Sequence, residues 1–137
     1  MRGFLPPSPS NQPEAAFFWR KAAEHELWLP RCEECSRFHF YPRGHCPHCH
    51  AKAIEWKAVC GLGTLYSFVI VERAPVAQFG QAVPYAPCLV DLDEGVRMAS
   101  HIDVGGGTLD NLNIGARLKV AFTKTRNGMT IPSFKAA

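Results

Sequence analysis

The stretch CEECSRFHFYPRGHCPHC, from Cys32 to Cys49, places four cysteines and three histidines within eighteen residues. The cysteines form two Cys-x-x-Cys pairs that are separated by ten residues. Each pair can present two sulfur atoms to one ion, and two pairs at this spacing are typical of a zinc ribbon. We therefore expect one structural Zn²⁺ ion, bound by Cys32, Cys35, Cys46 and Cys49.

Other roles for this stretch agree less well with its sequence. Four histidines lie in or beside it and could replace a cysteine, but four thiolates already complete a tetrahedron. These are His39, His45, His48 and His50. A redox pair is expected at the start of a helix that follows a βαβ strand, and neither pair has that setting. A closed site leaves no position at which the metal could activate water, so we expect no catalysis there.

Length and composition bound the answer further. The chain has 137 residues, enough for one ordinary domain or two very small ones. It has no run of 18 apolar residues, and its N-terminus lacks the apolar region of a signal peptide. We therefore expect a soluble, cytoplasmic protein that does not bind a membrane. In that reducing compartment, the six cysteines favour metal ligands or free thiols over disulfides.

We expect three parts along the chain: residues 1–29 as an N-terminal tail and helix, 30–57 as the zinc ribbon, and 58–137 as an OB-fold. Met1 to Gln12 holds three prolines and no periodic pattern, so it is expected to be an extended tail. After it, Asn11 and Glu14 have the spacing of a capping box.

The predicted helix has an apolar stripe with helical spacing. It consists of Ala15, Phe18, Trp19, Ala22 and Ala23. Phe17 lies off this stripe, so it either packs elsewhere within the chain or contacts another protein. We take Phe17 and Trp19 as candidate partner contacts.

From Cys60 onward the apolar pattern changes to a period of two, which predicts strands. Five are expected, at residues 63–73, 85–92, 96–102, 116–125 and 129–134. Asn127-Gly128 is a strong hairpin signal between the last two. Five short strands without a crossover helix favour a small closed barrel, most simply a five-stranded OB-fold. The predicted fold is therefore mainly β, with an N-terminal helix, a rubredoxin-like zinc ribbon and an OB-fold barrel.

The remaining reactive side chains do not form a catalytic set. Cys60 and Cys88 are expected to be buried small hydrophobic residues in strands. His101 is expected to be a surface or interface residue. No Ser-His-Asp or Cys-His arrangement can be assembled, and the triple glycine at 105–107 lacks the Lys-Ser/Thr of a phosphate-binding loop. We therefore expect no catalytic residues and no independent enzyme activity.

The order of these features resembles the DUF35 family of acyl-CoA-associated zinc-ribbon and OB-fold proteins. The resemblance runs from about Pro13 to Phe134, and its most specific part is the two cysteine pairs followed by GLGT at 61–64. It also includes Pro84-Tyr85, the turn LDEG at 92–95 and Ile114-Gly115. The sequence departs from relatives at Glu24-His25-Glu26, where they often carry a glycine.

This resemblance implies a function that composition does not show. Members of the family assemble with thiolase-superfamily enzymes, including thiolases, aldolases and acyltransferases, or fuse with hydratase-like subunits. Some help to hold the CoA part of an acyl-CoA while the partner performs the chemistry. The resemblance thus implies an accessory, non-catalytic subunit with an enzyme partner and acyl-CoA as ligand.

The distribution of charge suggests where such a ligand could bind. The chain carries a formal charge of +3, and residues 117–137 contain basic side chains without an acidic one. These cations either form a solvated face or a site for phosphates. Our candidates for CoA phosphates are Arg73, Arg117, Lys119, Lys124 and Arg126. The alternative function is binding of single-stranded nucleic acid, which both modules can support. It is disfavoured because the aromatic residues Tyr66 and Phe68 lie on a different predicted strand from these cations.

Overall fold

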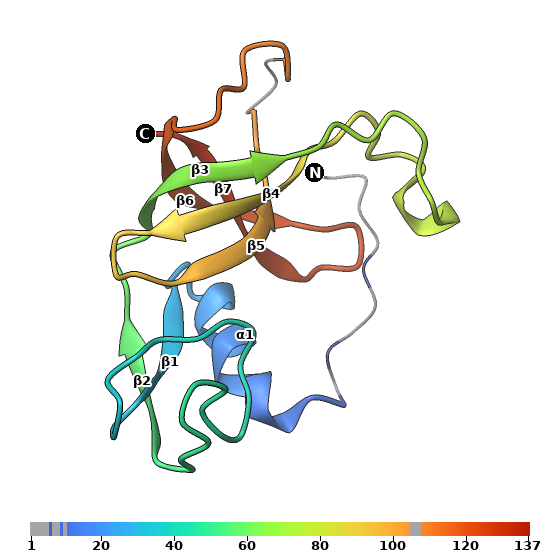
Figure 1. The fold of residues 1–137 in the computed structure, drawn as a ribbon. Helices are drawn as coiled ribbons and strands as arrows, with labels where there is room; N and C mark the ends of the chain where they lie inside the picture. Colours follow the sequence, from blue (N-terminus) through green and yellow to red (C-terminus); the bar gives the residue numbers. More distant parts are fainter. Residues whose placement is uncertain (1–5, 7–8, 10, 105–107) are drawn as a thin grey trace.

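The computed structural model describes residues 6, 9, 11–104 and 108–137 (Figure 1). Most of the expected tail, residues 1–5, 7–8 and 10, and the triple glycine at 105–107 lie outside this description. Regular structure begins with a 3₁₀ turn at Pro13–Ala15 and the helix α1 at Ala16–Ala23, and a second 3₁₀ turn lies at Ala77–Phe79. The strands are β1 (Trp28–Cys32), β2 (Ile54–Ala58), β3 (Leu62–Phe68), β4 (Pro87–Leu92), β5 (Arg97–His101), β6 (Arg117–Lys124) and β7 (Thr130–Ala136).

The strands form two antiparallel sheets. β1 and β2 make a hairpin-like pair below the larger sheet in Figure 1, and the larger sheet has the order β5-β4-β3-β6-β7. This sheet curls until its two edges meet at a parallel bridge between Ile102 and Phe134. The Ser100 hydroxyl also donates a hydrogen bond of 3.0 Å to the Pro132 carbonyl. The mainly β fold, with one short helix, a ribbon-like cysteine cluster and an OB-like sheet, is confirmed.

A glycine at the centre of the sheet lets the strands approach closely. Gly63 on β3 lies between Leu92 of β4 and Leu118 of β6. A Cβ atom at this position would lie 2.7 Å from both the Asp91 carbonyl oxygen and Val90 Cγ1. Any side chain here would therefore push β3 away from β4.

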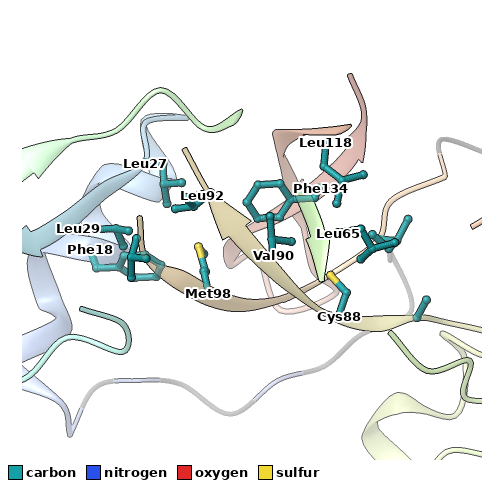
Figure 2. Close-up of a cluster of buried hydrophobic side chains, with 13 residues drawn as sticks. Phe18, Leu27, Leu29, Leu65, Cys88, Val90, Leu92, Met98, Leu118 and Phe134 are labelled. Atoms are coloured by element: carbon teal, nitrogen blue, oxygen red, sulfur yellow. The ribbon is translucent and has the colours of Figure 1, made fainter. Parts of the chain in front are cut away.

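One apolar core joins the helix and both sheets. It contains Phe18 of α1 and Leu29 of β1 together with Val90 of β4 and Phe134 of β7, all less than 3% exposed. Figure 2 shows Phe18, Leu27 and Leu29 at one end of this cluster and the barrel residues Leu65, Leu118 and Phe134 at the other. The ribbon and the barrel are consequently packed on each other through shared side chains.

Two local expectations differ from the structure. The capping box does not form, because neither helical segment has a side-chain hydrogen bond at its N-terminus. The first long strand ends at Phe68 rather than at residue 73, and beyond it only Val71 forms a bridge, with Tyr85. Val69 and Ile70 are largely exposed in that segment. The apolar pattern of the sequence thus continues beyond the last paired residue of the strand, which is why the predicted strand is too long.

The departure at Glu24-His25-Glu26 has a simple structural consequence. α1 ends at Ala23, and the backbone N–H groups of Glu24 and Glu26 both bond to the Lys21 carbonyl. His25 takes a left-handed conformation with φ of 62°, the region that glycine adopts most easily. Its ring stacks on Phe122 of β6 with a centroid distance of 5.3 Å, which gives the side chain a packing role there.

Among the described residues, none of the helices has the length and apolar character needed to cross a bilayer.

Candidate metal centre and basic hollows

The structure brings the four expected cysteine sulfurs together. All four lie within 4.8 Å of one another, and they form the single group of three or more potential ligands found among the described residues. Cys32 and Cys49 have sulfurs 3.6 Å apart, as do Cys35 and Cys46. A tetrahedron with Zn–S bonds of about 2.3 Å has edges of about 3.8 Å, so the donor set fits one zinc ion.

Each cysteine pair lies on a turn of the same geometry. In the first turn, the Cys35 backbone N–H points to Cys32 Sγ at 3.4 Å, and the Ser36 N–H donates to the Cys32 carbonyl at 2.9 Å. In the second, the His48 N–H points to Cys46 Sγ at 3.3 Å, and the His50 N–H donates to the Cys46 carbonyl at 2.9 Å. These backbone donors hold the sulfurs in place and favour the thiolate that a metal requires.

Ser36 and His50 close the two turns in a left-handed conformation, with φ of 64° and 65°. The chain then pairs back on itself in the same way in both turns. The Cys32 N–H donates to the Arg37 carbonyl at 2.9 Å, and the Cys46 N–H donates to the Ala51 carbonyl at 2.8 Å. The ribbon is therefore built from two copies of one turn.

The pKa values of two of the clustered thiols shift in opposite directions. Desolvation alone would raise the pKa of Cys46, but hydrogen bonds from the Cys49 and His48 backbone lower it to about 6. For Cys49 a backbone hydrogen bond from Ala51 lowers the pKa, whereas desolvation and the adjacent Cys32, Cys35 and Cys46 raise it to about 12. One thiolate thus forms more easily and opposes ionisation of its neighbours, a repulsion that a bound cation would offset.

The histidines near the cysteines lie outside the ligand group. His39 is 3% exposed, and burial lowers its pKa, with further lowering from His48, Arg43 and His45. His45, His48 and His50 are exposed. The group of clustered potential ligands therefore consists of the four cysteines without these histidines.

The two candidate partner contacts, Phe17 and Trp19, both pack within the chain. Phe17 lies 4.9 Å from the Trp56 ring and 5.6 Å from the Trp28 ring, measured between centroids. Trp19 donates a hydrogen bond of 2.8 Å to the Tyr41 hydroxyl. Both remain half-buried, so each keeps an accessible edge next to the ribbon.

The basic candidates do not form one cluster. Arg117, at the start of β6, forms a bidentate ion pair with Asp93 at 2.8 Å and also donates to the Thr64 hydroxyl at 3.1 Å. Hydrogen bonding to Arg117 accordingly lowers the pKa of Asp93. Lys119 is exposed two residues further along the strand. Arg73 is exposed in the loop after β3.

Lys124 and Arg126 lie at the opposite end of β6 and do come together. They line a hollow of about 530 Å³ with Phe122, Thr123, Thr125 and the carboxylate residue Asp103. Arg126 reaches across to the loop after β3, where it donates to the Gln78 carbonyl at 3.5 Å. Of the five candidates, these two are therefore the pair that could share one phosphate group.

Two other predictions about single residues are wrong. Cys60 was expected to be buried, but it is exposed where the chain passes between the sheets, and its backbone N–H donates to Glu94 at 2.8 Å. His101 was expected at the surface, but it is 9% exposed and burial lowers its pKa to about 4. In β5 the strand curls toward β7, so the outward side of His101 is covered. Cys88 is buried as expected, and burial raises its pKa to about 12.

A second hollow was missed at the level of sequence. It has a volume of about 760 Å³ and lies between β6, β7 and residues of the segment 102–116. Its lining comes from four separate regions of the chain, so no local sequence motif indicates that it exists. Arg117 and Lys135 are its cationic residues.

Comparisons with known proteins agree with this two-part architecture. The family model for the rubredoxin-like zinc ribbon domain of ChsH2 matches residues 19–55, and the model for the C-terminal OB-fold domain of ChsH2 matches residues 56–123. The chain also superposes on a solved chain described as an Ltp2-ChsH2(DUF35) aldolase. That match has a TM-score of 0.80 and 26% identity, and covers 94% of this chain and 98% of the other.

Two curated relatives are similar to most of this chain. A probable enoyl-CoA hydratase alpha subunit of Thermomonospora curvata is 29% identical over 97% of this chain, which spans 40% of that relative's length. A DUF35 domain-containing scaffold protein of Methanothermobacter thermautotrophicus is 30% identical over 79% of this chain and 80% of its own length. The chain therefore belongs to the DUF35 family of zinc-ribbon and OB-fold proteins.

Proposed function

We propose that the protein is an accessory, non-catalytic subunit that binds an enzyme partner and helps to hold its CoA thioester. The observation that carries this proposal is the match along nearly the whole chain to a DUF35 chain described as part of an aldolase. Relatives named as a scaffold protein and as a hydratase subunit support it. The partner is a thiolase-superfamily enzyme, such as a thiolase, aldolase or acyltransferase, or a hydratase subunit.

The contacts of the acidic side chains and of His101 are compatible with a non-catalytic role. The carboxylates of Asp91 and Asp93 are each engaged by an arginine at 2.7 to 2.8 Å. His101 lies on a different strand from both carboxylates and is buried. We expect the purified chain to turn over no acyl-CoA substrate, and thiolase, aldolase or thioesterase activity from partner-free material would overturn the proposal.

We further propose that Cys32, Cys35, Cys46 and Cys49 hold one structural zinc ion. The observation behind this is that their four sulfurs lie within 4.8 Å of one another, with no other ligand in the group. Elemental analysis should give one zinc per chain, and Cys46→Ser should lose most of it because three thiolates bind more weakly than four. A chain with much less than one zinc would contradict this assignment.

For the CoA phosphates we propose the hollow of Lys124 and Arg126, with Arg73 on the neighbouring loop as a further contact. Arginine and lysine together supply the charge-assisted donors that phosphate oxygens need. Replacing both Lys124 and Arg126 by alanine should weaken CoA binding about tenfold in calorimetry, because two partly exposed charge contacts are lost. Binding of a phosphate-free pantetheine thioester is the control and should change little.

The same titration distinguishes CoA binding from the alternative function, binding of single-stranded nucleic acid. CoA binding that depends on these two cations supports the proposal. If the parent chain instead prefers single-stranded DNA to CoA at physiological salt, the nucleic-acid function is correct. Equal CoA binding by parent and variant would place the phosphates elsewhere.

The partner contact is proposed to include the accessible edges of Phe17 and Trp19, at the boundary of the N-terminal part (1–29) and the ribbon (30–57). Phe17→Glu should weaken copurification with the partner, since aromatic contacts near cations are frequent binding hot spots. Ile114→Glu on the barrel part (58–137) serves as a control, because Ile114 is 62% exposed and far along the chain. If only the control weakens binding, the contact lies on the barrel.

A further inference from the structure

The hollow between β6, β7 and residues of the ranges 102–104 and 108–116 is a further concave feature for which a ligand class can be argued. Its volume of about 760 Å³ falls in the range of small-molecule sites, which is about 300–1,000 Å³. This hollow adjoins the Lys124–Arg126 hollow, since both are lined by Asp103 and Phe122, but its cationic residues are different ones, Arg117 and Lys135.

Most of the wall of this hollow is apolar. Leu65 and Leu118 are 1% and 3% exposed and line its buried side. Leu112 and Phe122 are half-buried and line it from the loop and from β6. Such a wall favours an alkyl body over a sugar or a base, because burying apolar surface is the main gain available there.

The charged residues of the hollow are distributed unevenly along β6. Arg117 begins β6, whereas Asp103 accepts a hydrogen bond of 3.2 Å from Thr123 near the other end of that strand. Thr123 lies six residue steps along the strand from Arg117, which corresponds to about 20 Å. Within this hollow an anionic group is therefore favoured at the Arg117 end, because Lys124 and Arg126, which share the neighbouring hollow with Asp103, do not line this one.

A like-charge pair strengthens the attraction at the Arg117 end. Lys135 of β7 lines the hollow and lies directly opposite Lys119 of β6 in the strand register. Like charges in this position oppose each other, and neither lysine has an ion pair among residues 11–104 and 108–137. A bound anion would relieve this repulsion. The charge of Arg117, by contrast, is already partly neutralised by its ion pair with Asp93.

From these observations we propose that the hollow binds an alkyl carboxylate, with its chain along Leu112 and Phe122 and its carboxylate at Lys135, whose attraction for an anion is reinforced by Lys119 opposite it on β6. The apolar wall and the unneutralised lysines each select one half of this ligand. The assignment does not depend on CoA binding at Lys124 and Arg126.

The test is a titration of the ¹⁵N-labelled, zinc-loaded full chain with sodium decanoate, followed by NMR. We expect saturable shifts of the backbone amides of Leu112, Asn113, Ala116 and Lys135. Decanol is the uncharged control and should bind several-fold more weakly, because it gains nothing from the lysines. Shifts confined to the exposed apolar residues Val69 and Ile70, or equal affinity for decanol and decanoate, would overturn the proposal.

Two exposed variants locate the carboxylate without risk to the fold. Lys135→Gln should weaken decanoate binding about threefold to fivefold and leave decanol binding unchanged, as expected for one partly exposed charge contact. Lys57→Gln on β2, outside the hollow, is the matched control and should bind decanoate as the parent does. If both variants behave alike, the lysine of β7 does not hold the anion. CoA affinity measured on the same samples reports independently on the proposed function.

Discussion

At the scale of single residues, Gly63 shows how one missing side chain sets the spacing of the sheet. A Cβ there would lie 2.7 Å from the Asp91 carbonyl oxygen, which belongs to the backbone and cannot rotate away. We expect Gly63→Ala to lower the free energy of unfolding by about 1–3 kcal/mol, as overpacked sites typically do. Denaturant unfolding measures this.

Gly44 offers the matched control for that substitution. A Cβ at Gly44 has no atom within 4 Å, and its φ is not in the left-handed region. Gly44→Ala should therefore leave the stability within about 0.5 kcal/mol of the parent. An equal loss in both variants would mean that the close approach of β3 and β4 is not the cause.

His101 couples the stability of the barrel to pH. Burial lowers its pKa to about 4 from an ordinary value of 6.5. The unfolded chain then binds a proton between about pH 6.5 and 4 that the folded chain does not. Stability from this group is present above pH 6.5 and is lost as the pH falls, by on the order of 3 kcal/mol at pH 4.

His101→Gln should flatten this part of the stability profile, measured by denaturant unfolding at several pH values between 4 and 7. His39 has its pKa lowered in the same direction, and the cysteine cluster also takes up protons in acid, so some loss will remain. An acid profile identical in the parent and the variant would assign the whole effect to those groups.

At the scale of elements, the two cysteine turns depend on residues that are not ligands. Ser36 closes the first turn with a φ of 64°. Glycine adopts this backbone conformation without strain, whereas a β-branched residue is strained in it. Ser36→Gly should thus be neutral or stabilising, by up to about 1 kcal/mol, whereas Ser36→Val should destabilise the chain by about 1–3 kcal/mol. Thermal unfolding of the zinc-loaded variants compares them, and the opposite order would show that the serine side chain itself holds the turn.

The sequence predicts these elements unevenly, for physical reasons. Local signals were reliable: the cysteine spacing placed the turns, and Asn127-Gly128 placed the hairpin between β6 and β7. Signals that depend on distant packing were not. His101 alternates as an outward residue, yet the curl of the sheet covers it. Residues 69–73 have a strand pattern, but β6 pairs with β3 only as far as Thr64 and the sheet ends at Phe68.

The basic candidates show the same limit. Their positions on β6 and around the hairpin follow from alternation, as expected, because Arg117 and Lys119 face outward while Leu118 is buried. Their partners do not follow from sequence. The ion pair of Arg117 with Asp93 joins residues that are 24 positions apart. It engages the cation at the start of β6, whereas Lys124 lies at the other end of that strand.

At the scale of the whole molecule, the shared core makes the ribbon part of the barrel's stability. Phe18 and Leu29 pack in the same cluster as Val90 and Phe134 (Figure 2). Phe18 and Leu29 precede the ribbon (30–57), which adds the partly buried residues Phe38, Phe40 and Trp56 to this cluster. We therefore expect the structure of the ribbon to depend on the metal, and its loss to expose one end of the barrel core. We expect removal of zinc by a chelator to lower the melting temperature of the entire chain rather than of the ribbon alone, because metal binding adds to the free energy of folding.

Fluorescence and circular dichroism distinguish these outcomes. Trp19, Trp28 and Trp56 all lie in or beside the ribbon, so tryptophan emission follows that part, while far-ultraviolet dichroism follows the barrel strands. The zinc-loaded chain should give coincident transitions by both methods, and Cys46→Ser should shift both to lower temperature together. If tryptophan emission changes first and the strand signal keeps its original midpoint, the contacts of Phe18 and Leu29 do not couple the two parts, and the barrel is stable without the metal.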